Sequence, residues 1–210
     1  MVAVARSAEV LRILDRYLVE VVERYELCPW ARATREHGAL GAEVLWGTPA
    51  LDAWVAAAER VLAAPGVRVA MVVAPELAGP RDELAALRDR VAARLPWAGV
   101  AEFHPDAALE LARPARVVPF VRRSPDPLLQ LVPLALIDAV RDVGPPADLA
   151  RQAAMLSGHA APSRPALAAR IAAANHATVT AVHAELAAVL DAIAADRRAS
   201  YARLGITACR

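Results

Sequence analysis

Hydrophobic residues recur at steps of three and four along the first and last parts of the chain, which is the spacing of amphipathic helices. Over residues 7–26 the apolar positions are Val10, Leu14, Tyr17, Val21 and Tyr25. The same spacing predicts one long helix over residues 165–197, with a seam that consists of Ile171, Asn175, Thr178, Val182, Leu186, Val189 and Ile193. Each helix is expected to pack one face against a core.

Between these two segments, short apolar stretches alternate with helical ones. Three stretches predict strands, "GAEVLWG", "GVRVAMVVAP" and "GVAEFHP", and "ARVVPFV" is a candidate fourth strand. The segments between the first three predict helices, "PALDAWVAAAERVLAA" and "GPRDELAALRDRVAARL". This alternation predicts an α/β fold with a small three- or four-stranded sheet flanked by helices.

The chain after Pro125 is predicted to be helical. "DPLLQLVPLALIDAVRDVG" is interpreted as a helix with a kink at Pro133, because proline removes a backbone donor inside a helix. "PADLARQAAML" is interpreted as a short helix that precedes the long one. These helices are expected to form a C-terminal helical layer.

The absence of a long linker predicts one α/β domain over residues 1–204. The sheet is expected within residues 7–125 and the helical layer over residues 126–197. Residues 205–210 follow a glycine, show no apolar periodicity and include Cys209. They are expected to form a loose tail, since chain termini usually fray.

Composition narrows the classes of function. The chain is 57% hydrophobic and 22% charged, which favours a well-buried core over disorder. Its net charge of +1, aromatic content of 4% and scattered arginines argue against a nucleic-acid binder. The most apolar stretch, "LLQLVPLALIDAV", is too short to span a membrane, and the N-terminus does not resemble a signal peptide. We expect a cytoplasmic protein whose partner is a small molecule rather than nucleic acid or a membrane. The oligomeric state stays open.

The stretch "LCPWA" places Cys28 directly before a proline. If Pro29 begins a short helix, Cys28 is its N-cap, where backbone N–H groups and the helix dipole favour a thiolate. Arg32 and Arg35 would add positive field, which predicts a thiol pKa below the ordinary value. The alternative is a buried thiol that packs as a small apolar side chain beneath Trp30.

His104 follows the third predicted strand and is locked in place by Pro105. In a largely parallel sheet the carboxyl ends of the strands share one edge, where ligands of open α/β sheets bind. Thr48 and Glu76 would lie at the same edge. His104 is therefore a candidate general base or metal ligand, and the alternative is a structural histidine bonded to a loop carbonyl.

The stretch "FVRRSPDPLL" combines two arginines with a predicted helix start. A guanidinium beside a helix N-terminus suits a carboxylate or phosphate group, because all the donors point one way. Arg123 is therefore a candidate anion clamp, and Arg122 and Ser124 are candidates for substrate binding. The alternative is that one of the arginines only pairs with Asp126.

Taken together, these motifs resemble a bacterial family known as domain of unknown function 1415. The matching stretches are "LCPWA", "FHPD" and "RSPDP", and the likeness covers roughly residues 10–190, including an asparagine–threonine pair in the last helix, Asn175 and Thr178. Four features depart from the family's pattern: Trp30 for phenylalanine, Arg122 for asparagine, Asp126 for tyrosine, and "AALEL" in place of the aromatic residues after "FHPD". The resemblance implies no activity. It implies that Cys28, His104, Arg123, Ser124 and Pro125 belong to one recurrent set.

The leading hypothesis is an enzyme that acts on a small anionic metabolite by group transfer. Cys28 would be its nucleophile, His104 its general base and Arg123 its anion clamp, all in one pocket at the carboxyl edge of the sheet. The pocket is expected to contain Glu76 as a further polar group and Trp30 and Phe120 as apolar walls. The alternatives are a metal or haem centre ligated by Cys28 and His104, and a non-catalytic module that binds a small molecule or a partner protein. The sequence leaves the cofactor open.

Overall fold

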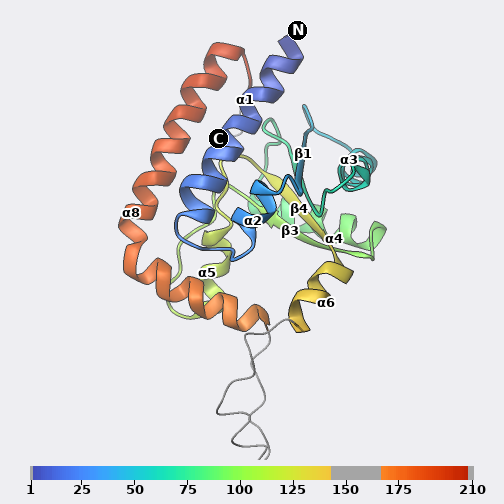
Figure 1. Cartoon of the computed structure of the whole chain (residues 1–210). Helices are drawn as coiled ribbons and strands as arrows, with labels where there is room; N and C mark the ends of the chain where they lie inside the picture. Colours follow the sequence, from blue (N-terminus) through green and yellow to red (C-terminus); the bar gives the residue numbers. More distant parts are fainter. Residues whose placement is uncertain (1, 143–166, 208–210) are drawn as a thin grey trace, which may run out of the picture.

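The architecture is a four-stranded mixed sheet flanked by helices, in a computed structural model that describes residues 2–142 and 167–207 (Figure 1). The strands are β1 (Leu40–Val44), β2 (Val69–Val73), β3 (Ala98–Phe103) and β4 (Leu128–Pro133), in the order β1-β2-β4-β3. β1 pairs parallel to β2, while β4 pairs antiparallel to both β2 and β3. The predicted α/β class with a small sheet is confirmed.

One inner strand of the sheet, β4, was predicted wrongly from the sequence. The stretch "LLQLVP" was expected to be helical and to lie in the helical layer after residue 125, but it forms a central strand. Leu128 packs on one face of the sheet, and Leu129 and Leu131 pack on the other. A strand that is buried on both faces has a continuous apolar sequence, which periodicity alone cannot distinguish from a buried helix.

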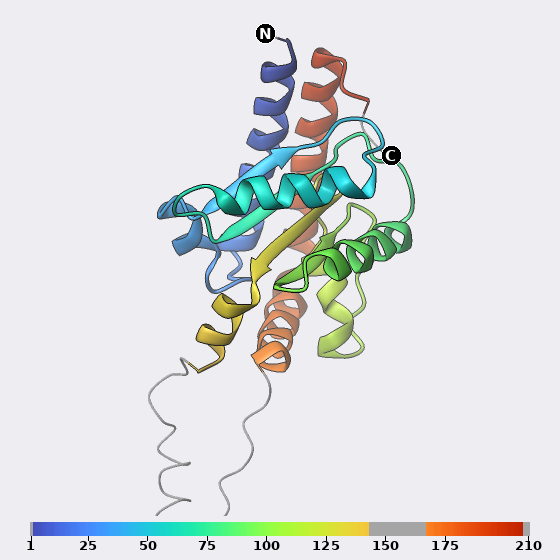
Figure 2. The ribbon, with the colours of Figure 1, turned by 90° about the vertical axis from the view of Figure 1, so that its right-hand side faces the viewer.

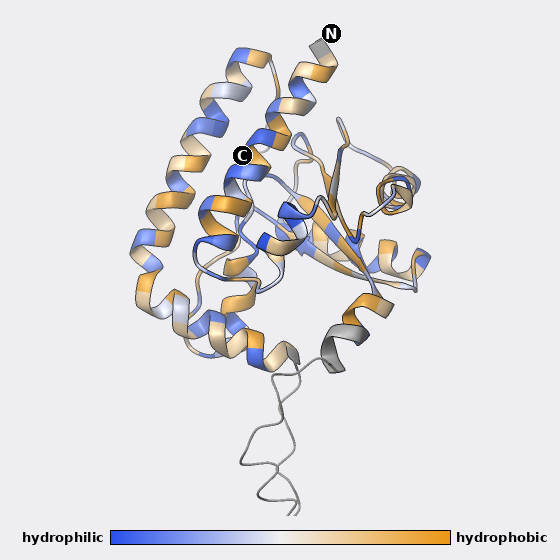
Figure 3. Ribbon diagram, viewed as in Figure 1, coloured by the Kyte–Doolittle hydropathy of each residue, from blue (hydrophilic) through white to orange (hydrophobic). Residues whose placement is uncertain are grey.

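Helices cover both faces of the sheet, as Figure 2 shows with α3 in front and α1 and α8 behind. On one face lie α3 (Leu51–Ala63) and α4 (Arg81–Arg94), with a core that includes the fully buried Trp54. On the other face lie α1 (Val2–Tyr17), α5 (Pro114–Val121) and α8 (Leu167–Leu204). In Figure 3 the helices carry both apolar and polar residues, as expected of elements with one buried side.

The helix α5 corrects a second prediction, because "ARVVPFV" was a candidate strand. Pro114 occupies the first turn of this helix, where its missing N–H costs nothing, and Pro119 lies inside it. Val117 and Phe120 are both buried, which is the three-residue step of a helix and not the alternation of a strand. The sheet therefore has a fourth strand, but it is formed by Leu128–Pro133 and not by "ARVVPFV".

The first predicted helix changes its geometry before it ends. After α1 the chain continues as a π-helix, η1 (Leu18–Glu23), and then as a turn that leads to the short helix α2 (Ala31–Glu36). Glu26, within that turn, has a φ of 52°, in the left-handed region that residues other than glycine seldom adopt. Cys28 follows two residues later.

The long helix α8 is confirmed, and it extends beyond the predicted end. Its backbone departs from helical geometry at Val182 (φ −127°, ψ 18°), which separates a first half from a second half (Figure 1). At its end Gly205 has a φ of 61°, and the N–H of Ile206 donates to the carbonyl of Tyr201 at 3.0 Å. These contacts form a Schellman cap with a buried Ile206.

The tail predicted from Gly205 is therefore anchored at Ile206. Cys209 and the predicted helix "PADLARQAAML" lie outside the described residues. Among the helices that the structure describes, one segment (Ala168–Leu204) is long and apolar enough to cross a membrane by length and composition alone. Its second half instead makes buried and ionic contacts with the rest of the protein.

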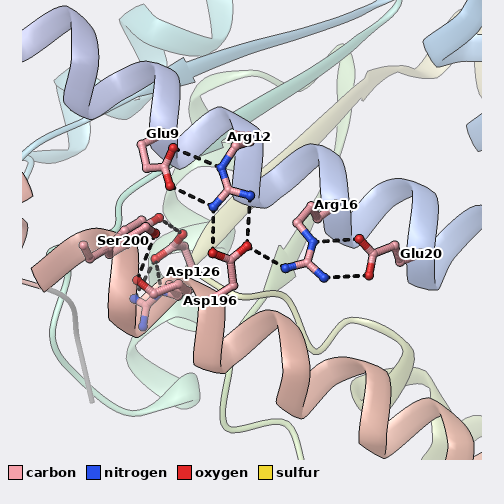
Figure 4. Close-up of polar contacts among 9 residues, drawn as sticks. Glu9, Arg12, Arg16, Glu20, Asp126, Asp196 and Ser200 are labelled. Atoms are coloured by element: carbon pink, nitrogen blue, oxygen red, sulfur yellow. Dashed lines mark hydrogen bonds and ion pairs between the residues drawn. The ribbon is translucent and has the colours of Figure 1, made fainter. Parts of the chain in front are cut away.

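Ion pairs join the second half of α8 to α1 (Figure 4). The carboxylate of Asp196 accepts hydrogen bonds from Arg12 at 2.9 Å and from Arg16 at 2.5 Å. Glu9 and Glu20 in turn accept from the same two guanidinium groups. The two arginines hold the pKa of Asp196 down at about 2.

A buried carboxylate joins α8 to the start of β4. Asp126 is 3% exposed and accepts a hydrogen bond from Arg197 Nε at 2.8 Å and another from the Tyr201 hydroxyl at 2.6 Å. Burial raises the pKa of Asp126, and the two partners oppose that rise. One of the alternatives kept open by the sequence, that an arginine of "VRRSP" pairs with Asp126, does not hold, because the partner comes from α8.

Neutralising Asp196 should weaken the folded state in a pH-dependent way. The folded pKa of about 2 lies below the ordinary 3.8, so the stabilisation is complete above about pH 4 and disappears as the pH falls to 2. We expect Asp196→Asn to lower the free energy of unfolding by about 1 kcal/mol at pH 7, as is typical of partly exposed ion pairs. Urea titrations at pH 7, 4 and 2.5 measure it. The matched control is Asp191→Asn, an exposed change on the same helix, and a pH-independent difference would contradict the assignment.

Removing the buried carboxylate of Asp126 should lower the free energy of unfolding more than neutralising Asp196 does. Asp126→Ala removes the buried carboxylate to which both Arg197 and Tyr201 donate, and we expect a loss of about 3–5 kcal/mol in the free energy of unfolding. Tyr201→Phe removes one neutral donor and should cost about 1–3 kcal/mol. Circular dichroism during urea unfolding provides the measurement. A loss below about 1 kcal/mol for Asp126→Ala would show that this contact does not anchor α8.

Candidate functional site

Several predicted site residues do follow strand ends at one edge of the sheet. β1, β2 and β3 all run in the same direction, since β4 is antiparallel to both β2 and β3. Glu76 comes shortly after β2 and His104 directly after β3, as expected. The sheet order separates them, however, because β4 lies between β2 and β3.

Glu76 is engaged in a contact with the N-terminal helix. Its carboxylate accepts a hydrogen bond from Arg6 at 2.6 Å and another from the backbone N–H of Gly47 at 3.0 Å. The guanidinium of Arg6 also stacks on the ring of Trp46, 4.3 Å from its centroid. These partners fix α1 against the loop after β1, which leaves Glu76 a structural rather than a substrate-binding role.

His104 is a buried structural residue, as the second interpretation of it proposed. Its Nε2 lies 3.2 Å from the carbonyl of Gly79, and its Nδ1 accepts a hydrogen bond from the N–H of Asp106 at 3.2 Å. This pattern assigns the proton to Nε2, and burial lowers the pKa of the imidazole. With both ring nitrogens engaged, His104 has no free lone pair for a proton or a metal ion.

Arg123 and Ser124 lie beside His104. The backbone N–H of His104 donates to the carbonyl of Arg122, and Arg123 Nε donates to the carbonyl of Pro105 at 3.0 Å. Arg123 and Ser124 line a pocket of about 330 Å³ against the second half of α8. The hydroxyl of Ser124, however, donates to the carbonyl of Asp126 at 2.5 Å, which makes it part of the turn into β4.

The other two predicted residues from this stretch are placed differently. Arg122 turns away from that pocket toward Glu102, which lies 3.7 Å from its guanidinium. Phe120 is 3% exposed and belongs to the core between the sheet and α1 and α8. Neither therefore acts as a wall or a donor of the pocket that Arg123 lines.

Cys28 lies in a different pocket. The N-cap of α2 is Trp30, so Cys28 lies two residues before the cap and is not, as predicted, the cap itself. Burial is the largest influence on the thiol and raises its pKa, while the backbone N–H groups of Trp30 and Ala31 act in the opposite direction. The expected depression of the thiol pKa is therefore wrong.

The pocket around Cys28, here called the Cys28 pocket, has a volume of about 770 Å³. It lies between the segment of residues 23–37 and the first half of α8, and its lining includes Cys28, Trp30, Arg32, Arg170 and Asn175. Volumes of 300–1,000 Å³ are typical of small-molecule sites. This pocket is larger than the one that Arg123 lines, and Arg123 does not belong to its lining.

The charges of the Cys28 pocket are balanced. Glu23 is buried and paired with Arg35 at 2.6 Å, which neutralises it and also explains why Arg35 adds no free positive field at the thiol. The exposed lining then contains two guanidinium groups, Arg32 and Arg170, and two carboxylates, Glu26 and Glu36. A purely anionic ligand is less suited to this lining than one with groups of both signs.

Asn175 is the residue whose importance the sequence analysis underestimated. Its position on the apolar seam of the last helix was noted, as was its pairing with Thr178, but it was not placed in the site. Asn175 is 5% exposed, lines the Cys28 pocket and forms no side-chain hydrogen bond with any part of the chain that the structure describes. The signal in the sequence was a polar residue among the seam positions of the predicted last helix, which is the side expected to be buried.

Two departures from regular backbone geometry border the same pocket. The π-helix of residues 18–23 and the left-handed Glu26 precede Cys28, and both Glu23 and Glu26 belong to the pocket lining. π-helical turns and strained backbone concentrate at functional sites. Their common position favours the Cys28 pocket over the smaller one.

The structure therefore brings His104, Arg123 and Ser124 together but leaves Cys28 in another pocket. The metal alternative loses its ligand pair for the same reason. Within residues 2–142 and 167–207 no three histidine, cysteine, aspartate or glutamate side chains are placed to share a metal ion.

The thiol should react slowly at neutral pH in the ligand-free protein. Since burial raises the pKa of Cys28, the iodoacetamide labelling rate should keep increasing above pH 9, where an ordinary thiol approaches its plateau. The experiment uses a Cys209→Ser background and mass spectrometry of the labelled peptide. A plateau reached below pH 8 would instead demonstrate the activated thiolate that the sequence predicted.

No protein-family model matches the chain, and neither does any curated protein or solved structure. The resemblance to domain of unknown function 1415 therefore stays a prediction that depends on its short motifs. The geometry of the Cys28 pocket is the remaining basis for a function.

Proposed function

We propose that the protein binds a small polar molecule, with charged groups of both signs, in the Cys28 pocket. The observation that carries this proposal is the side chain of Asn175. It is buried, faces the pocket and has no hydrogen-bond partner among the described residues. An amide in that position can accept and donate at the same time, which fixes the orientation of a polar ligand.

The amide of Asn175 is open to the pocket rather than sealed in the core. Among the described residues, the buried side-chain atoms without a hydrogen-bond partner are Arg6 Nε and Trp54 Nε1, and Asn175 is not one of them. Its neighbour on the seam, Val179, is fully buried and apolar. The hydrogen-bonding groups of Asn175 are therefore left for solvent or for a ligand in the pocket.

The charged lining suggests the chemical class of the ligand. Arg32 and Arg170 lie on the two walls of the pocket, one on each side, and can take a carboxylate or phosphate group. Glu26 and Glu36 can take an ammonium or guanidinium group. Trp30, which is 38% exposed, offers an apolar face at the entrance. Amino acids, short peptides and similar zwitterions combine these features.

Chemistry at Cys28 is the second candidate, because the thiol faces the same pocket and the nearby backbone N–H groups of Trp30 and Ala31 act to lower its pKa against the effect of burial. A ligand with an activated acyl group would react by formation of an S–C bond as the bond to the leaving group breaks, with the thiol proton transferred to that leaving group. The raised pKa of the thiol means that this step requires a bound ligand to stabilise the thiolate. In this proposal His104 and Arg123 support the fold and take no part.

Replacing the unpartnered amide should separate binding from stability. We expect Asn175→Leu to leave the melting temperature unchanged or to raise it, because leucine has a similar volume and the change breaks no hydrogen bond with a described residue. The same change should weaken ligand binding at least about tenfold. The probe is a panel of amino acids and dipeptides, with thermal shift and with protection of Cys28 against iodoacetamide as readouts.

The matched controls are His183→Gln, an exposed change on α8, and Arg123→Gln in the other pocket, neither of which should alter binding. Cys28→Ser should retain binding and abolish any turnover. A large drop in melting temperature for Asn175→Leu, with no ligand of either charge protecting Cys28, would instead identify Asn175 as a structural residue.

A further inference from the structure

A second cluster of charged side chains lies at the outer edge of β3, away from the Cys28 pocket. We define the Glu102 cluster as Glu102 on β3, Arg81 and Arg88 on α4, and Arg122 after α5. Glu102 is 3% exposed, and its carboxylate is the only acid at the centre of the described cluster. Its three partners are guanidinium groups, which leaves an excess of positive charge.

The bonding within the cluster is uneven. Arg81 and Arg88 donate to the two oxygens of Glu102 at 3.1 and 2.8 Å. Arg122 only approaches one of these oxygens at 3.7 Å, which is beyond hydrogen-bond distance. Its guanidinium forms no hydrogen bond with any described residue and faces the ring of Phe103, 5.8 Å from the centroid.

The charges therefore do not balance at Arg122. A carboxylate carries one negative charge, and the first two arginines already exceed it, although Arg88 also bonds to the exposed Asp89. His104, next to β3, is neutral in the tautomer that its hydrogen bonds define. Burial lowers the pKa of Arg122, Glu102 opposes that effect, and the charges of Arg88 and Arg81 lower the pKa further.

The geometry points to an oxyanion site, for a phosphate group, between Arg122 and Arg81. Each of these two arginine side chains is about one-third exposed, so a ligand can reach it from solvent. Arg81 uses one of its five N–H donors on Glu102 and Arg122 uses none, which leaves a set of donors that matches the oxygens of a phosphate. The bound anion would balance the excess charge. This inference is independent of the ligand proposed for the Cys28 pocket.

The test uses inorganic phosphate as the probe, at constant ionic strength maintained with sodium chloride. The melting temperature of the wild-type protein should rise with phosphate and then saturate. Arg122→Gln should lose this effect, with a dissociation constant raised at least about tenfold, because a charge-assisted hydrogen bond is lost. In the absence of phosphate, Arg122→Gln should melt no lower than the wild type, since it relieves repulsion.

Two further variants keep the test decisive. Arg88→Gln should lower the melting temperature with and without phosphate, because Arg88 holds the buried Glu102 directly. Arg68→Gln, a change of an exposed arginine elsewhere, should leave the phosphate effect intact. The inference is overturned if phosphate stabilises the wild type no more than chloride does, or if Arg122→Gln keeps the phosphate effect.

Discussion

The buried carboxylate of Asp126 is the contact on which the arrangement of the long helix depends. It lies at the entry to the central strand β4 and is bonded by Arg197 and Tyr201, which are one helical turn apart on α8. Burying the charge of Asp126 is costly, and only the full set of partners offsets that cost. The second half of α8 is therefore fixed in rotation and position against the sheet, and Arg12 and Arg16 then align α1 beside it through Asp196. These contacts hold the scaffold of the helical face.

The Cys28 pocket lies where this scaffold ends. Its walls are the turn after η1 and the first half of α8, beyond the kink at Val182, and the ion pairs with α1 belong to the other half. His176 is bonded to the carbonyl of Leu111 at 2.9 Å, which attaches the first half to the loop before α5. The second half of α8, held by Asp126 and the ion pairs, and the first half, held through His176, meet at the non-helical Val182. The first half, which forms one wall of the Cys28 pocket, can therefore differ in position without loss of the Asp126 contact.

The sequence predicted the class of fold and seven of its elements, the helices α1, α3, α4 and α8 and the strands β1 to β3, because the helices are amphipathic and the strands are short apolar stretches between turn residues. It failed at "LLQLVP", since a strand between two others is apolar on both faces, and at "ARVVPFV", where valine and proline favoured a strand locally but the burial of Val117 and Phe120 required a helix. The edge that gathers Glu76 and His104 was also predictable from strand direction. Which strand lies between them was not, because strand order depends on long-range pairing.

The site was harder to predict than the fold, for a physical reason that His104 and Asn175 illustrate. A histidine at a strand end before a proline is equally consistent with catalysis and with a loop contact, and only the carbonyl of Gly79 and the N–H of Asp106 decide between them. Residue type carries the chemistry of a side chain, but its function depends on whether its hydrogen bonds are already satisfied within the fold. His104 is satisfied and Asn175 is not. Because the amide of Asn175 has no hydrogen-bond partner among the described residues and lines the Cys28 pocket, its hydrogen-bonding groups are available to a ligand, which the motifs around Cys28 alone could not indicate.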